Sequence, residues 1–229
     1  MDWTAWTTWL ALLNIIGFNI LLSGDNAVVI AMAARSLKPE YQKKAIIWGS
    51  AAAIVMRIIL TILAVELLKQ PYLKIVGGAL LFWIGYQLLA DGDDEADIKA
   101  HASVGAAIRT ILIADLVMSL DNVIAVAGAA EHAPPESRLM LVIIGLLTSI
   151  PLIIWGSTLL VKIMDKFPII ITLGAALLGG LAGVMLVTDP SVEAWFIAHV
   201  PFVKYIVGAL GAVLVVAVAK WMSKREAKA

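Results

Sequence analysis

The chain has 229 residues, of which 62% are hydrophobic and 15% are charged, and its formal net charge at pH 7 is +0. Soluble domains average about 45–50% apolar and about 25% charged residues, so this composition predicts a polytopic membrane protein. A balanced charge argues against nucleic acid as a partner. The sequence contains no cysteine, which excludes disulfides, thiolate metal sites and cysteine nucleophiles.

Seven apolar stretches are long enough to cross a bilayer at about 1.5 Å per residue. In chain order they cover residues 9–34, 44–68, 72–90, 106–130, 139–163, 168–187 and 201–222. The first stretch follows Met1-Asp2-Trp3 without any Lys or Arg, so it lacks the basic region of a signal peptide and is expected to be a mature span.

The positive charges predict the orientation of these spans. With the N-terminus outside, 12 of the 17 Lys and Arg residues fall on the inner side, four fall on the outer side, and Arg57 lies within the second span. The positive-inside rule therefore predicts the cell (cytoplasmic) membrane as the location, with the N-terminus outside and the C-terminus in the cytoplasm.

The two halves of the chain match each other without gaps at an offset of 96 residues. The offset pairs Ser23 with Ser119, Asp25 with Asp121 and Asn26 with Asn122, and further along it pairs Gly49 with Gly145. Similar composition would explain shared aliphatic residues, but not the coincident Ser-x-Asp-Asn and Gly positions. Each half holds three spans, an odd number, so the second copy enters the membrane from the opposite side, as in alternating-access transporters.

The expected fold is therefore all-α, with seven transmembrane helices arranged as a 3+3 inverted repeat plus one extra C-terminal helix. The first repeat spans residues 1–90, an acidic cytoplasmic loop spans 91–105, and the second, inverted repeat spans 106–188. An external loop, the seventh helix and a basic cytoplasmic tail make up residues 189–229.

Polar residues recur inside the first and fourth spans. Asn19, Ser23 and Asn26 are spaced i, i+4 and i+7, which places them on one helical stripe, and the matching stripe in the second repeat is Asp115, Ser119 and Asn122. Asp25 and Asp121 lie about 120° from these stripes in a regular helix. Either each Asp faces a different neighbour, or the helix unwinds locally around Gly24 and Leu120; glycine gives a reason for unwinding only in the first copy.

A carboxylate in the middle of an apolar span costs about 2.5–3.5 kcal/mol and marks a functional site by default. All the candidate ligands are oxygen donors, which suit Mg²⁺, Ca²⁺ or Mn²⁺ better than Cu⁺ or Zn²⁺. The predicted metal ligands are Asp25, Asn26, Asp121, Asn122, Asp115, Asn19, Ser23 and Ser119. The structural alternatives are that Asn19 joins helices, that the two serines bond back to carbonyls, and that Arg57 is a counter-ion rather than a gate.

At Leu22-Ser23-Gly24-Asp25-Asn26 and Met118-Ser119-Leu120-Asp121-Asn122 the chain resembles the TerC family, within the wider group related to the lysine exporters. The resemblance covers nearly the whole chain. Members of that family are implicated in Mn²⁺ export, and some in supplying metal to secreted enzymes. The resemblance implies a manganese exporter with Asp25, Asn26, Asp121 and Asn122 at the ion site, and it also points to Asp115. Many relatives have Glu where this chain has Asn19, which removes one charge.

Three functions follow from these observations. The leading hypothesis is a secondary transporter, not an enzyme, that exports a divalent cation such as Mn²⁺; it has no Walker-type motif, no catalytic residues and no resident cofactor. An intramembrane aspartyl protease would use two facing carboxylates, but Tyr-Asp and Gly-x-Gly-Asp motifs are absent. The third hypothesis is a membrane partner that hands metal to exported proteins. The expected partners are the metal ion and lipids, with homo-oligomers and the secretion machinery left open.

Overall fold

The computed structural model describes residues 6–67, 70–93, 103–130 and 137–226. Within these ranges every regular element is a helix, which agrees with the predicted all-α fold. In chain order the helices are α1 (Trp6–Leu21), α2 (Gly24–Arg35), α3 (Pro39–Leu67), α4 (Leu73–Asp93), α5 (Val104–Ala130), α6 (Arg138–Thr148), α7 (Ile150–Lys166), α8 (Ile169–Val187), α9 (Glu193–His199) and α10 (Val203–Glu226).

Within the described ranges, five helical segments are long and apolar enough to cross a membrane, and α1 with α2 makes a sixth when that bent pair is taken as one span. The residues of α6 and α7 together form one of the five, from Arg138 to Lys166. Helix α5 has 27 residues and carries Arg109, Asp115 and Asp121. The chain is thus an integral, multi-pass helical protein. Of the predicted acidic loop, residues 94–102 lie outside the described part.

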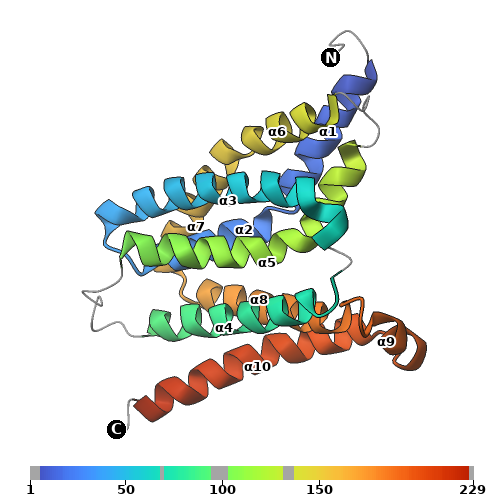
Figure 1. Ribbon diagram of the computed structural model, residues 1–229. Coiled ribbons are helices and arrows are strands. Elements are labelled where there is room, and N and C mark those ends of the chain that lie inside the picture. The colour runs from blue at the N-terminus through green and yellow to red at the C-terminus, as the bar shows by residue number, and fades with distance from the viewer. Residues whose placement is uncertain (1–5, 68–69, 94–102, 131–136, 227–229) are drawn as a thin grey trace.

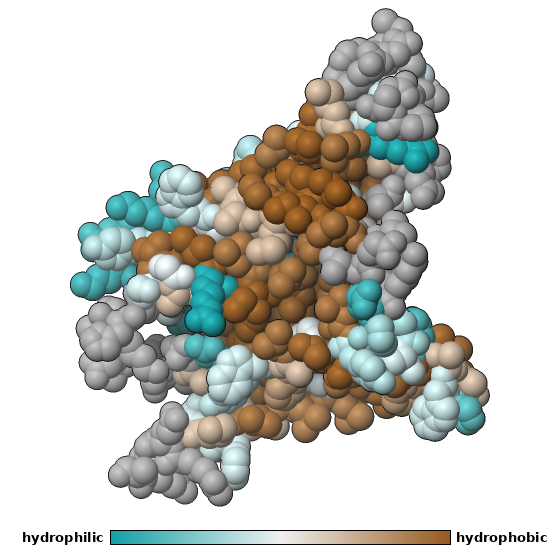
Figure 2. All heavy atoms as spheres, viewed as in Figure 1, coloured by the Kyte–Doolittle hydropathy of each residue, from teal (hydrophilic) through white to brown (hydrophobic). Residues whose placement is uncertain are grey.

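The helices form two groups (Figure 1). One group contains α1, α2, α3, α5, α6 and α7; the other contains α4, α8 and α10, in which α8 packs against both α4 and α10. Successive spans run in alternating directions, so the two termini lie at opposite ends of the helices. Figure 2 shows a broad hydrophobic surface over the middle of the helices, with hydrophilic residues concentrated toward their ends, as a bilayer requires.

Small residues bring α4, α8 and α10 into close contact. A side chain on Gly179 or Gly183 would collide with the backbone of α10, and one on Gly85 would crowd α8. The small-residue pattern of α8 therefore serves helix packing, in the manner common among membrane helices.

The first predicted span is broken in the middle. Helix α1 ends at Leu21, α2 begins at Gly24, and the two axes differ by 45°. The N–H of Asn26 donates to its neighbour, the Asp25 carboxylate, at 2.8 Å, so the Leu22 carbonyl lacks its usual i+4 partner. Of the two alternatives that the sequence left open, local unwinding is present around Gly24, whereas α5 is helical through the equivalent Leu120.

A second interruption was not predicted. The fifth span divides at Ser149 into α6 and α7, with Pro151 in the first turn of α7. Proline has no N–H to donate and disfavours a helical conformation in the residue before it, so it tends to interrupt a helix. The position of Pro151 inside the predicted span was the available signal.

One type of helix–helix packing contact occurs twice, with the roles of the two halves of the chain reversed. A side chain on Gly49 of α3 would collide with Ile111 of α5, and a side chain on Gly145 of α6 would collide with Ile15 of α1. The offset of 96 residues pairs Gly49 with Gly145 and Ile15 with Ile111. The same close contact therefore occurs twice, and in each case the glycine comes from one half and the isoleucine from the other.

Candidate functional site

A buried arginine organises the polar residues of the first helix group. Arg57 of α3 donates from Nε to Ser119 Oγ at 3.0 Å, from Nη1 to Asn19 Oδ1 at 2.9 Å and to Ser23 Oγ at 3.4 Å, and from Nη2 to Asp115 Oδ1 at 2.5 Å. Ser119 also donates to Asp115 Oδ2 at 3.2 Å. We call Asn19, Ser23, Arg57, Asp115 and Ser119 the Arg57 group.

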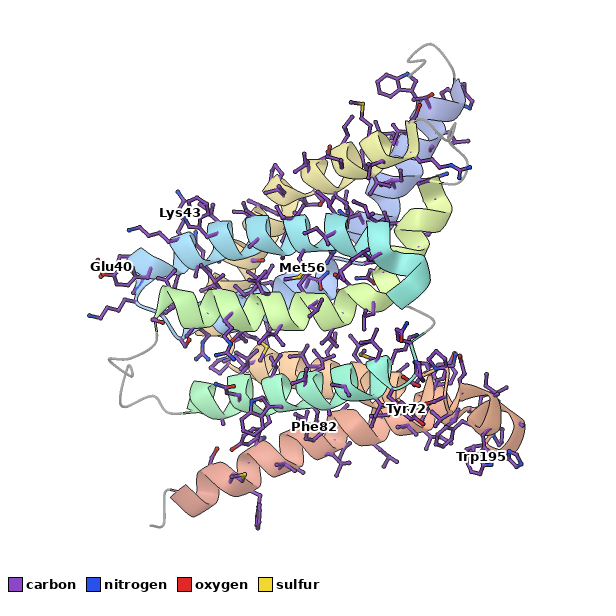
Figure 3. The ribbon with its side chains drawn as sticks, in the orientation of Figure 1. Glu40, Lys43, Met56, Tyr72, Phe82 and Trp195 are labelled. Atoms are coloured by element: carbon purple, nitrogen blue, oxygen red, sulfur yellow. The ribbon has the colours of Figure 1, made fainter. Side chains whose placement is uncertain are left out.

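The Arg57 group lies deep within the helices. Arg57 is 2% exposed and Asp115 is 5% exposed, so two opposite charges are almost completely removed from solvent. Arg57 lies about 27 Å along the axis from the start of α3 and about 15 Å from its end. Figure 3 shows its neighbour Met56 well along α3, away from the helix end that carries Glu40 and Lys43. Such a pair is tolerated only because each charge is paired and hydrogen-bonded.

The Leu22 carbonyl accepts hydrogen bonds from two asparagine side chains. Asn26 Nδ2 and Asn122 Nδ2 both donate to Leu22 O, each at 3.2 Å, and Asn26 and Asn122 are repeat-equivalent residues. Within the described residues, Asn26 Oδ1 is a buried oxygen without a hydrogen-bond partner. The Asp25 carboxylate, half-buried, lies beside it at the start of α2. We call the Leu22 carbonyl, Asp25, Asn26 and Asn122 the Leu22 group.

The structure therefore divides the predicted metal ligands into two neighbouring groups. Asn19, Ser23, Asp115 and Ser119 contact Arg57, whereas Asp25, Asn26 and Asn122 belong to the Leu22 group. Asp121 lies in α5, but its side chain lies outside the described part of the structure. Among described residues, no three His, Cys, Asp or Glu side chains cluster as metal ligands would. The carboxylates of the described site are thus Asp25 and the Arg57-paired Asp115.

The sequence did not point to two members of this site. Ser149, at the interruption between α6 and α7, accepts a hydrogen bond from Asn19 Nδ2 at 2.5 Å and donates to Leu146 O at 2.7 Å. The Leu22 carbonyl is a main-chain oxygen whose availability to side-chain donors depends on the break. Gly24 signalled the break, and Pro151 could have signalled the interruption at Ser149.

A cavity of about 160 Å³ lies between the two interruptions. Its lining includes Ser23, Gly24, Ser149 and Ile153, and apolar side chains such as Trp155 make up the rest. Trp155 is 64% exposed, so the cavity lies near the outer surface of the helix bundle. It borders the Arg57 group through Ser23.

A separate polar contact fixes the turn where α4 begins. Asp189, after α8, accepts hydrogen bonds from the backbone N–H groups of Tyr72, Lys74 and Ser191 at 2.9–3.1 Å, and from the Ser191 hydroxyl. Burial acts to raise the pKa of Asp189, but these bonds outweigh it and hold the pKa below its ordinary value. Tyr72 has a positive φ of 66°, an uncommon conformation for a bulky residue, and Asp189 holds its N–H in place.

The described site therefore contains buried oxygens of carboxylate, amide, hydroxyl and carbonyl groups. They come from both halves of a multi-pass membrane protein and lie near its interrupted helices. The chain belongs to the TerC family of integral membrane proteins, whose family model matches residues 4–227.

Its relatives are bacterial membrane proteins. It is 47% identical over 190 residues to the uncharacterized membrane protein YjbE of Bacillus subtilis, covering 83% of this chain and 85% of the relative. It is 24% identical over 198 residues to YceF of the same organism, covering 79% and 75% of the two chains. It is 24% identical to the Escherichia coli inner membrane protein YoaE, covering 95% of this chain and 43% of that one. No solved structure matches the chain.

Proposed function

We propose that the protein is a secondary transporter that exports a divalent cation, most consistent with Mn²⁺, through a site built by the two Asp-Asn motifs. The observation that carries the proposal is the Leu22 group. It combines a main-chain carbonyl released by a helix break, the carboxylate of Asp25, and a buried Asn26 oxygen without a described partner. Hard cations bind carboxylate and carbonyl oxygens of this kind.

The proposal includes a 3+3 inverted repeat within seven spans. The exchanged Gly49–Ile111 and Gly145–Ile15 contacts support it, because a two-fold relation between the halves would produce each contact twice with the roles reversed. The shared bonding of Asn26 and Asn122 to one carbonyl also supports it, since equivalent residues of two inverted copies meet near their common axis. The proposal assigns Asp121, the repeat equivalent of Asp25, as the second carboxylate ligand.

The orientation in the cell membrane is part of the proposal. Lys43 of α3, Arg109 of α5, Lys162 of α7 and Lys220 of α10 lie on the helix ends that point the same way as the C-terminus. The positive-inside rule makes that end cytoplasmic. Export then carries the cation from this end toward the end that holds α9.

The test is Mn²⁺ flux into liposomes that contain only the purified protein. We expect flux from the wild-type protein, loss of most of it in Asp25→Asn and Asp121→Asn, and wild-type flux in Asp165→Asn. Asp165 is a suitable control because its side chain, near the end of α7, is 57% exposed, and its carboxylate pairs with Arg35 at 3.5 Å. Metal binding without flux would support a metal-supplying partner, and equal flux in all variants would refute the site.

A further inference from the structure

The guanidinium of Arg57 forms hydrogen bonds with several of the side chains that the sequence predicts to be metal ligands. A guanidinium has five N–H donors and no acceptor, and those of Arg57 reach oxygens of Asn19, Ser23, Asp115 and Ser119 at 2.5–3.4 Å. Four of the eight side chains predicted to hold a metal ion are therefore engaged by a cation that belongs to the protein itself.

These four oxygens come from equivalent places in the two halves. Asn19 and Ser23 in the first half correspond to Asp115 and Ser119 in the second, at the offset of 96 residues. Arg57 has no such counterpart, because the equivalent position is Ile153. A site assembled from two matching oxygen pairs thus receives one positive charge, from one half of the chain.

A cavity adjoins Ser23, one of the hydrogen-bond partners of the guanidinium. Ser23, which accepts from Arg57 Nη1, also lines the cavity of about 160 Å³, together with Ser149 and Ile153. A side chain that gives up Asp115 therefore has a neighbouring volume with two hydroxyl groups on its wall.

We propose that Arg57 is a tethered competitor for the transported cation. It holds the oxygens of Asn19, Ser23, Asp115 and Ser119 while the metal is absent, and it releases Asp115 to the metal as the metal binds. Its return to Asp115 then helps to expel the metal. The residue acts by competition and sets the metal affinity, and this role rests on the proposed transport function.

The test measures Mn²⁺ affinity of the purified full chain by the loss of the free-ion paramagnetic resonance signal, alongside Mn²⁺ flux in liposomes. Suppose that Arg57 occupies the oxygens in about nine tenths of the molecules. Only about one tenth of the protein can then bind Mn²⁺, and Arg57→Gln makes all of it competent, so the apparent Mn²⁺ affinity should increase about tenfold. Flux should fall, because the bound metal is no longer displaced. Arg109→Gln, an exposed arginine in the first turns of α5, is the control and should change neither quantity.

Two further measurements separate competition from a structural role. In Arg57→Ala, a few millimolar free guanidinium should weaken Mn²⁺ binding by re-entering the vacated site, while the wild-type protein should be unaffected. Arg57→Lys keeps a positive charge near the site but lacks the planar guanidinium, so the Mn²⁺ affinity of this variant should lie between those of the wild type and Arg57→Gln. This variant provides the test if the neutral variants do not fold. Unchanged or weaker Mn²⁺ binding in folded Arg57 variants would overturn the proposal. A wild-type protein that neither binds nor carries Mn²⁺ would instead refute the proposed function.

Discussion

The two copies of the Asp-Asn motif have the same polar residues but different backbones. Ser23-Gly24-Asp25-Asn26 lies at a helix break, whereas Ser119-Leu120-Asp121-Asn122 lies within the uninterrupted α5. The break exposes the Leu22 carbonyl, and the asparagines of both copies bond to it. Within the motif the two copies differ at one position, glycine or leucine, and only the copy with glycine lies at a break that leaves a main-chain oxygen without its helical partner.

The next span of each half shows the opposite asymmetry. Helix α3 is continuous, while its counterpart is divided into α6 and α7 at Ser149. The residue equivalent to Pro151 is Val55, which leaves α3 without a breaker. Each half therefore contributes one interrupted span and one continuous span to the site, and the two interruptions face each other across the cavity.

The largest effect on stability should come from Asp115. Asp115→Ala leaves the buried Arg57 charge unpaired, which typically costs about 3–5 kcal/mol. Thermal unfolding in detergent measures this as a lower midpoint. Asp165→Ala, which breaks an exposed pair with Arg35, should change stability by less than about 1 kcal/mol.

A double variant sharpens that prediction. Replacing both charges, in Arg57→Leu with Asp115→Leu, removes the unpaired charge and should recover most of the stability lost in Asp115→Ala. A double variant as unstable as the single one would show that the Arg57–Asp115 pairing is not the reason for the loss.

Exchanging the residue that distinguishes the two motifs should affect transport more than folding. Gly24→Leu gives the first motif the residue of the second, and no atoms outside the local helix lie within 4 Å of the added Cβ position. Leucine has a higher helix propensity than glycine, so the free energy of unfolding of the variant should increase by about 1 kcal/mol or less. Mn²⁺ flux in liposomes should fall several-fold, because a straighter helix withdraws the Leu22 carbonyl. Undiminished Mn²⁺ flux would show that the Leu22 carbonyl is not part of the transport site.

Pro151→Val makes the equivalent exchange in the next span. We expect a smaller decrease in flux, because Ser149 reaches the Arg57 group only through Asn19. Circular dichroism should show equal or slightly greater helicity, since valine restores the N–H that proline lacks. A greater loss of flux than in Gly24→Leu would reverse the order of importance of the two interruptions.

The smallest effect is expected outside the spans, at Asp189. Its pKa is lowered in the folded protein from an ordinary value of 3.8. The ionised carboxylate therefore stabilises the fold above about pH 4, and this contribution disappears as the pH falls through the lowered pKa. Asp189→Asn should lower the unfolding midpoint modestly at pH 7 and by less at pH 3. An equal decrease at both pH values would exclude the charge as the cause.

The sequence predicted the helical fold, because hydropathy acts locally, and it offered unwinding at Gly24 as one of two alternatives because glycine tolerates a break. It also singled out Asn19, Ser23, Asp115 and Ser119 as members of one polar constellation. It did not predict that Arg57 would engage all four, because a side chain from another span reaches them only through tertiary packing. Nor did it predict the interruption at Ser149, since the apolar run containing Pro151 reads as one span.

The most direct measurement is the position of bound Mn²⁺ in an experimental structure, located by its anomalous scattering. We expect one site within coordination distance of the Leu22 carbonyl and the Asp25 carboxylate, with ligands from both halves of the chain. A Mn²⁺ ion bound instead in the acidic segment of residues 91–97, with none near Leu22, would contradict it.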